Sequence, residues 1–102
     1  KFLEAFEKFY AEDCTMQEND EYPREGKESN RKFEMEWFSS VEDVHGFEIK
    51  DFAVNEETGT AFIHSWMELT FKGQGRMKME EVSIQHWKDG KIQSERFMYK
   101  GN

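Results

Sequence analysis

Three glutamates on separate predicted strands, Glu18, Glu81 and Glu95, have side chains suited to acid–base chemistry. If two of these carboxyl groups share a low-dielectric cavity, desolvation and mutual repulsion raise at least one pKa toward neutrality. A carboxylate tuned in this way can move a proton next to a carbonyl group. The alternative is that the glutamates are solvated at strand edges or paired with Arg76 or Arg96, since ion-pair networks also perturb carboxylates.

Histidine and cysteine offer no comparable site. His64 and His86 fall on adjacent predicted strands, but no third ligand is spaced to complete a catalytic zinc site. His45 precedes a glycine and is expected to be exposed in a turn. Cys14 follows the end of a predicted helix, so we expect a buried, unreactive thiol. The sequence has no glycine-rich phosphate loop, Ser-His-Asp set or dinucleotide fingerprint, and we predict neither a metal nor a cofactor.

The composition is that of a small, highly charged domain. Its 102 residues suffice for one hydrophobic core, to which aromatic residues, 16% of the chain, can contribute. The net charge of −8 argues against nucleic acid and against an anionic membrane surface as partners. No apolar run approaches the ~18 residues that span a bilayer, and a single cysteine excludes an internal disulfide. We therefore expect a cytoplasmic protein.

Apolar residues at helical spacing predict two helices near the start of the chain. The first covers Phe2 to Ala11 and has its phenylalanines on one face. A short strand at residues 14–18 and a loop at 19–26, which holds the only proline, come next. The second helix runs from about Lys27 to Ser40, with Phe33, Trp37 and Phe38 in its apolar stripe.

Alternating apolar residues after the second helix predict four strands joined as a meander. The first contains Phe47 and Ile49 and ends in a turn at residues 57–59. The next two cover residues 60–72 and 76–88, and the Asp89-Gly90 hairpin leads into the last, 91–100. Helices followed by antiparallel strands predict an α+β fold with the helices on one sheet face. No repeat or linker divides the single predicted domain, residues 1–102.

Local motifs along nearly the whole chain carry a resemblance to a known family. Residues 9–13, Phe-Tyr-Ala-Glu-Asp, resemble a family helix end, and residues 26–28, Gly-Lys-Glu, resemble the start of the next helix. Residues 87–92, Trp-Lys-Asp-Gly-Lys-Ile, resemble the hairpin before the final strand, and residues 95–99, Glu-Arg-Phe-Met-Tyr, resemble that strand's ending. In this order the sequence is similar to the nuclear transport factor 2-like superfamily, with its SnoaL-like and ketosteroid-isomerase-like members. The long first helix usual in the family is shortened, fused or absent here.

The resemblance implies a cystatin-like cone, in which a curved antiparallel sheet carries helices on its concave face and encloses a pocket. Counting from the family motifs, the general base of related isomerases falls on Glu18 and their oxyanion donor on Ser83. Glu95 is the third catalytic candidate. The same phasing turns a further set inward as candidate ligand-binding residues: Ile63, Ser65, Met67, Leu69, Met79, Glu81, Gln85, Phe97 and Tyr99.

Alternation by itself leaves the phase of the strand at 76–88 open. Val82 and Ile84 are its apolar members, and period-2 reasoning would bury them instead of Glu81 and Ser83. Both faces can be buried if the convex face packs against a second subunit, as in many relatives. The resemblance therefore implies a homodimer that forms through the convex face, with His64 and His86 on that same face.

Three classes of function fit the resemblance. The first is a SnoaL-like domain that binds a small hydrophobic molecule and uses a pocket carboxylate for isomerase or cyclase chemistry. The second is a non-catalytic dimeric module that only binds such a ligand, and the third is a protein-interaction module. Because one fold supports all three, the fold does not choose between them. The neutral hydroxyl of Ser83 is a weaker oxyanion donor than a neutral carboxylic acid, which weakens the isomerase interpretation.

Overall fold

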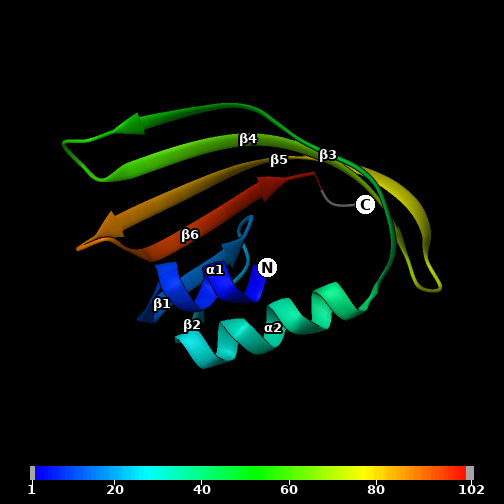
Figure 1. Cartoon of the computed structure of the whole chain (residues 1–102), viewed down its shortest axis with the longest axis horizontal. Helices are drawn as coiled ribbons and strands as arrows, with labels where there is room; N and C mark the ends of the chain where they lie inside the picture. Colours follow the sequence, from blue (N-terminus) through cyan, green and yellow to red (C-terminus); the bar gives the residue numbers. More distant parts are fainter. Residues whose placement is uncertain (1, 101–102) are drawn as a thin grey trace.

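The computed structural model describes residues 2–100, in which a curved sheet arches over two helices (Figure 1). The helices are α1 (Phe2–Phe9) and α2 (Lys27–Ser39). The strands are β1 (Tyr10–Glu18), β2 (Arg24–Glu25), β3 (Val41–Asn55), β4 (Thr60–Phe71), β5 (Gly75–Lys88) and β6 (Lys91–Tyr99). The predicted α+β class is confirmed. The ends of the predicted single domain, Lys1 and residues 101–102, lie outside the described residues.

The strands form one sheet in the order β2-β1-β6-β5-β4-β3. Strands β3 to β6 pair antiparallel as the predicted meander. The structure adds one parallel pair, β1 with β6, in which Met16 lies opposite Glu95. A hairpin fixes strand direction locally, but β1 and β6 lie at opposite ends of the chain, so no turn signal in the sequence reports their orientation. This pair brings the first strand to the floor of the cavity described below.

The chain leaves α1 earlier than predicted. The helix ends at Phe9, not Ala11, and β1 begins at Tyr10, not at Cys14. Tyr10, Ala11, Cys14 and Met16 are all buried, in one cluster with residues of α1 and β6. An irregularity in the pairing with β6 after Tyr10 lets the extended chain keep these side chains on the core. Burial raises the pKa of the Cys14 thiol, in line with the predicted unreactive cysteine.

Asn30 ties α2 to the first two strands. Its side chain is fully buried, and its amide nitrogen donates to the carbonyls of Arg24 (3.0 Å) and Gly26 (2.9 Å). Its amide oxygen accepts from the guanidinium of Arg24 at 3.1 Å. Gly26 has a φ of 94°, a left-handed conformation that favours glycine at the start of this helix. The loop predicted at 19–26 therefore contains a two-residue strand, β2, and a fixed helix entry.

Strand β3 begins at Val41, earlier than the predicted strand around Phe47, and is irregular. Its register against β4 shifts at three places, between Val41 and Asp43, between Val44 and Gly46, and between Ile49 and Asp51. These bulges keep every large apolar residue of β3 opposite the β4 residues of one sheet face, despite their uneven spacing. The apolar row consists of Val44, Phe47, Ile49, Phe52 and Val54, paired with Leu69, Met67, Ser65, Ile63 and Ala61.

The bulge between Val44 and Gly46 bears on the prediction for His45. This residue is exposed, as predicted, but it lies within β3 and not in a turn, and its ring forms a hydrogen bond with the Thr70 hydroxyl at 2.6 Å. A Cβ at Gly46 would come within 2.9 Å of the Trp66 ring, so any larger residue at this position would displace the ring. The short His-Gly pair resembles a turn in sequence because glycine serves both purposes.

The two faces of the meander have different surroundings. The face that carries Glu81 turns toward the helices, whereas Val82 lies on the opposite, convex face. Phe62, Val82 and Met98 on the convex face are each about two-fifths exposed in this single chain. The structure therefore turns toward the helices the same side of β5 that the family resemblance implied. Within residues 2–100, no helix has the length and apolar character needed to cross a membrane.

Candidate functional site

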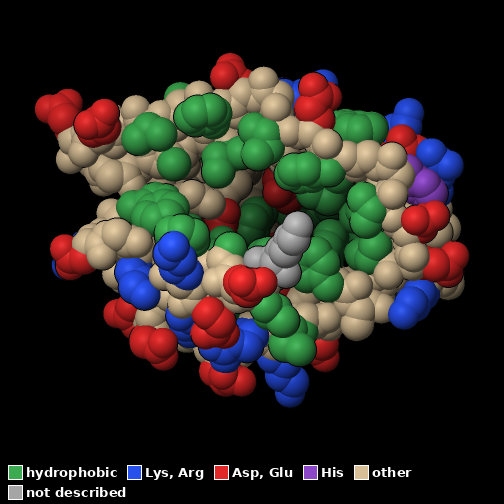
Figure 2. Space-filling model, in the orientation of Figure 1, with side chains coloured by type: hydrophobic (Ala, Val, Ile, Leu, Met, Phe, Trp, Pro, Cys, Tyr) green, Lys and Arg blue, Asp and Glu red, His purple; other side chains and the backbone are tan. Residues whose placement is uncertain are grey.

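A cavity of about 240 Å³ lies between the concave sheet face and α2 and opens to solvent (Figure 2). Hydrophobic side chains surround its mouth, and acidic side chains are visible inside it. Its wall combines seven aromatic residues, two methionines and four glutamates. They are Phe2, Tyr10, Phe33, Trp37, Phe38, Phe97, Tyr99, Met67, Met79, Glu18, Glu34, Glu81 and Glu95.

Glu95 lies at the buried end of the cavity and its carboxylate is fully engaged. It accepts hydrogen bonds from the Tyr10 hydroxyl, from Ser83 Oγ at 2.5 Å and from Gln85 Nε2 at 2.8 Å. Burial, followed by the charge of Glu95, raises the pKa of Tyr10 well above its usual value, so this phenol stays a donor. Three donors on one carboxylate compensate for its removal from water.

Glu18 enters the cavity from the end of β1 and also has partners. One oxygen lies 3.1 Å from Arg24 Nη2, and the other accepts from the Tyr99 hydroxyl at 2.8 Å. The Arg24 guanidinium stacks on the ring of Phe33, 3.5 Å from its centroid. Burial, with the hydrogen bond to Glu18, raises the pKa of Tyr99. The ion pair and the stacked ring hold Glu18 in place at the cavity edge.

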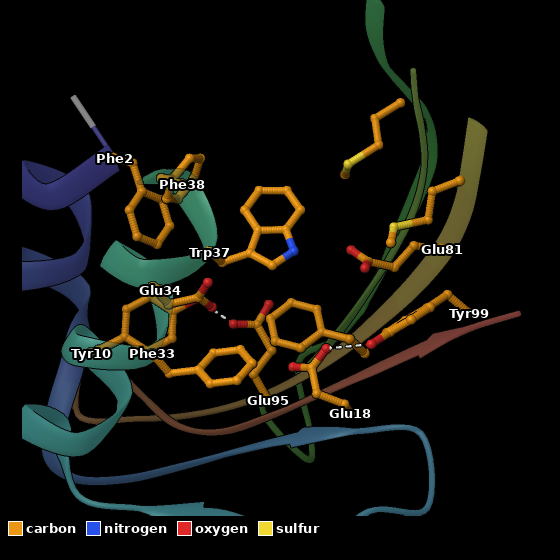
Figure 3. A pocket seen from close by; sticks show the side chains of 13 residues that line it. Phe2, Tyr10, Glu18, Phe33, Glu34, Trp37, Phe38, Glu81, Glu95 and Tyr99 are labelled. Carbon is orange, nitrogen blue, oxygen red and sulfur yellow. Dashed lines mark hydrogen bonds between the residues drawn. The ribbon is translucent and has the colours of Figure 1, made fainter. Parts of the chain in front are cut away.

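Glu34 and Glu81 differ from the other two glutamates because neither forms a hydrogen bond or ion pair within residues 2–100. Figure 3 shows their carboxyl groups on opposite walls, Glu34 on α2 and Glu81 on β5, with the Trp37 indole between them. Burial is the main cause that raises the pKa of each to about 7, and the charge of Glu18 is the next. A carboxyl group with this pKa can both donate and accept a proton near neutral pH.

Regular periodicity on each element places these side chains. On α2, Phe33 lies four residues before Trp37, and Glu34 lies three before Trp37 and four before Phe38, so the four side chains form one stripe along the helix. On β6, every second side chain points to the same face of the sheet, so residues 95, 97 and 99 all face the cavity. The pairing of Glu81 with Tyr99 and of Met67 with Met79 aligns neighbouring strands across the cavity wall.

A family model for the SnoaL-like domain matches residues 1–99. The chain belongs to the SnoaL-like domain family. Comparison of this SnoaL-like domain with curated proteins finds no match.

Solved structures show the same fold. A Mesorhizobium loti protein with the provisional name SnoaL-like polyketide cyclase is 31% identical, with a TM-score of 0.82, over 93% of this chain and 82% of that one. An NTF2-like protein of unknown function from Exiguobacterium sp. 255-15 is 14% identical, with a TM-score of 0.80, over 99% and 84% of the two chains. A protein from Catenulispora acidiphila with a ketosteroid isomerase-like fold, in complex with trimethylamine, is 15% identical, with a TM-score of 0.73, over 87% and 68%.

The SnoaL-like domain brings most of the predicted site residues to one cavity. The predicted residues on its wall are Glu18, Met67, Met79, Glu81, Glu95, Phe97 and Tyr99. Ser83 and Gln85 lie behind the wall, where they donate to Glu95. The Ser83 hydroxyl therefore donates its hydrogen bond to the Glu95 carboxylate and does not face the cavity as the predicted oxyanion donor.

Three further predicted ligand-binding residues lie outside this wall. Ser65 and Leu69 are buried on β4, and Ile63 borders a shallow hollow near Phe52 and Val82. Within residues 2–100, no three metal-ligating side chains converge.

Sequence reasoning missed the contribution of α2 and the start of β1. Glu34 and Tyr10 line the cavity, yet neither was a candidate residue. The signal for Glu34 was present, because it falls within the helix face defined by Phe33, Trp37 and Phe38.

Proposed function

We propose that this SnoaL-like domain binds a small, mostly apolar molecule in its cavity and transfers a proton to or from it, as in isomerase or cyclase chemistry. The observation that carries the proposal is the pair Glu34 and Glu81, two carboxyl groups without protein partners that face each other across aromatic walls. Their pKa values of about 7 suit one group to act as base while the other acts as acid.

In this proposal the earlier candidates have supporting roles. Glu18 holds its position through Arg24 and Tyr99, and Glu95 is saturated by three donors. Both keep negative charge close to the reacting pair and thereby favour a protonated form of Glu34 and Glu81. The provisional cyclase name of the Mesorhizobium relative and the trimethylamine bound by the Catenulispora relative support a small-molecule pocket in this fold.

The test is proton exchange catalysed next to a carbonyl group. In D₂O, NMR would follow deuterium entry at the α-carbons of 4-phenylbutan-2-one with the natural chain and with Glu34→Gln and Glu81→Gln. We expect each substitution to slow exchange by roughly 10²-fold, the usual contribution of a general acid or base. The control is Glu80→Gln, whose side chain bonds His64 on the convex face. Equal rates for all four proteins, with circular dichroism showing intact folding, would exclude catalysis by this pair.

The second candidate is a non-catalytic dimeric binding or interaction module. The exposed apolar side chains of Phe62, Val82 and Met98 on the convex face favour a homodimer that forms there. Sedimentation equilibrium of the natural chain and of Val82→Lys would test it, since a charge at this face should produce monomers. Ligand binding that survives in both Gln variants without proton exchange would favour this candidate. The cytoplasmic location stays a prediction.

A further inference from the structure

The charges around the cavity all have the same sign. Four of the wall residues are glutamates, and none of the described wall residues is Lys, Arg or His. Arg24, a cation that stacks on the wall residue Phe33, is not itself part of the wall and is already paired with Glu18. A ligand with a negative group would meet repulsion from every side, whereas a positive group would relieve the repulsion among Glu18, Glu34, Glu81 and Glu95.

The aromatic wall adds a second, independent preference for positive charge. Faces of Trp, Tyr and Phe attract cations within ~6 Å of the ring centroid, and Trp does so best. Trp37 stands between the two unpaired carboxyl groups. The chain already uses this wall in the same way, because the Arg24 guanidinium lies 3.5 Å from the centroid of Phe33.

We infer that the cavity takes an apolar molecule that carries one protonated amine or quaternary ammonium group, with the nitrogen between Glu34, Glu81 and the Trp37 ring. This inference rests on the proposed function and names its substrate class. A metal ion fits the wall poorly, because its four glutamates do not come together as a group of three ligands within residues 2–100 and the rest of the wall is mostly aromatic rings and methionines. An organic cation fits both the charge and the rings.

Protonation of the two carboxyl groups should control this binding. Apart from burial, the charges of Glu18, Arg24, Glu95 and Glu81 act on the pKa of Glu34, and those of Glu18 and Glu95 act on the pKa of Glu81. A bound cation favours their charged forms, so affinity for it should rise as pH increases through about 7. A neutral molecule of the same shape should show no such rise.

The test compares two probes that differ only in an N⁺ for a carbon, choline and 3,3-dimethylbutan-1-ol. NMR titration of the natural chain would follow the Trp37 indole N–H at pH 8 and pH 5.5. We expect choline to bind at least tenfold more tightly than the alcohol at pH 8, and less than threefold more tightly at pH 5.5. Equal or tighter binding of the alcohol at pH 8 would overturn the inference and leave the apolar pocket of the proposed function intact.

Variants separate a specific site from general charge attraction. Glu81→Gln and Glu34→Gln should each weaken choline binding at least fivefold at pH 8 and leave alcohol binding within twofold. Glu80→Gln removes the same charge one residue away, on the other sheet face, and should change neither probe by more than twofold. An equal loss in Glu80→Gln would overturn the inference in favour of long-range attraction by the net charge. If neither probe shifts Trp37 at any pH, both the pocket and the cation are rejected.

Discussion

The buried end of the cavity and its open middle contain the same chemical group in opposite situations. Glu95 at the buried end is 5% exposed and accepts from three side-chain donors. Glu34 and Glu81 in the middle have no hydrogen-bond or ion-pair partner within residues 2–100 and face each other across the cavity. The comparison teaches that burial alone does not make a carboxyl group reactive. A buried carboxylate with saturated oxygens is structural, whereas one without partners is available to a ligand.

The largest expected effect comes from removal of the buried carboxylate. Glu95→Ala leaves Tyr10, Ser83 and Gln85 without an acceptor and opens a void, so we expect a loss of about 3 kcal/mol in the free energy of unfolding. Urea denaturation measures it. The surface control Glu80→Ala should change stability by no more than about 0.5 kcal/mol. A loss below about 1 kcal/mol in Glu95→Ala would remove the distinction between the two regions.

The open pair should make stability depend on pH. Their pKa of about 7 in the folded chain exceeds the ordinary 4.5, so the folded state holds protons that the unfolded chain has released. Their contribution is therefore fully present below pH 4.5 and is lost as pH rises through 7. Water at the cavity mouth screens both groups, and we expect a total loss of about 2 kcal/mol between pH 5 and 8.

The measurement is urea unfolding of the natural chain and the Glu34→Gln/Glu81→Gln double variant at both pH values. The double variant should lack this part of the pH dependence, because an amide does not titrate in this range. Parallel pH profiles for the two proteins would show that the pair titrates normally and is solvated.

The smallest expected effect compares single donors in the two regions. Tyr10→Phe removes one donor from Glu95 but keeps the ring stacked on Phe6, with centroids 4.7 Å apart, so we expect a loss of about 1 kcal/mol. Tyr99→Phe removes the hydroxyl that bonds Glu18, which keeps Arg24 and contact with water. The free energy of unfolding should therefore fall by about half as much in Tyr99→Phe as in Tyr10→Phe. Thermal unfolding of both variants gives the order, and a larger loss in Tyr99→Phe would reverse the comparison.

Much of the fold could be predicted because its signals are local. The apolar stripe of α2, the Asp89-Gly90 hairpin and the alternation of β4 to β6 each depend on residues close in sequence. The predicted ends of helices and strands were wrong where a contact with a residue distant in sequence outweighed the local pattern. Tyr10 leaves the helix to reach the core cluster and the partner Ile92 on β6, and β3 bulges at Gly46 to pass the Trp66 ring.

The candidate site divides in the same way. The motifs that identify the SnoaL-like family also indicated that Glu18, Glu81 and Glu95 face a cavity, and all three line it. Ser83 as an oxyanion donor depended on what lies opposite its hydroxyl, and Glu95 occupies that position. Glu34 was missed because helix and strand patterns were read separately, although both face one cavity.

The sequence by itself determined the family and the order of helices and strands, because short motifs, periodicity and turn chemistry act over a few residues. The family resemblance, and not alternation, implied which side of each strand carries the carboxyl groups. Only the tertiary structure decided which of those carboxyl groups have partners. The donor and acceptor of the hydrogen bond between Tyr10 and Glu95 are 85 residues apart, and Glu34 and Glu81 line opposite walls of one cavity, from a helix and from a strand. Electrostatic environment depends on distance through space, so the chemistry of a glutamate is fixed only when the chain has folded around it.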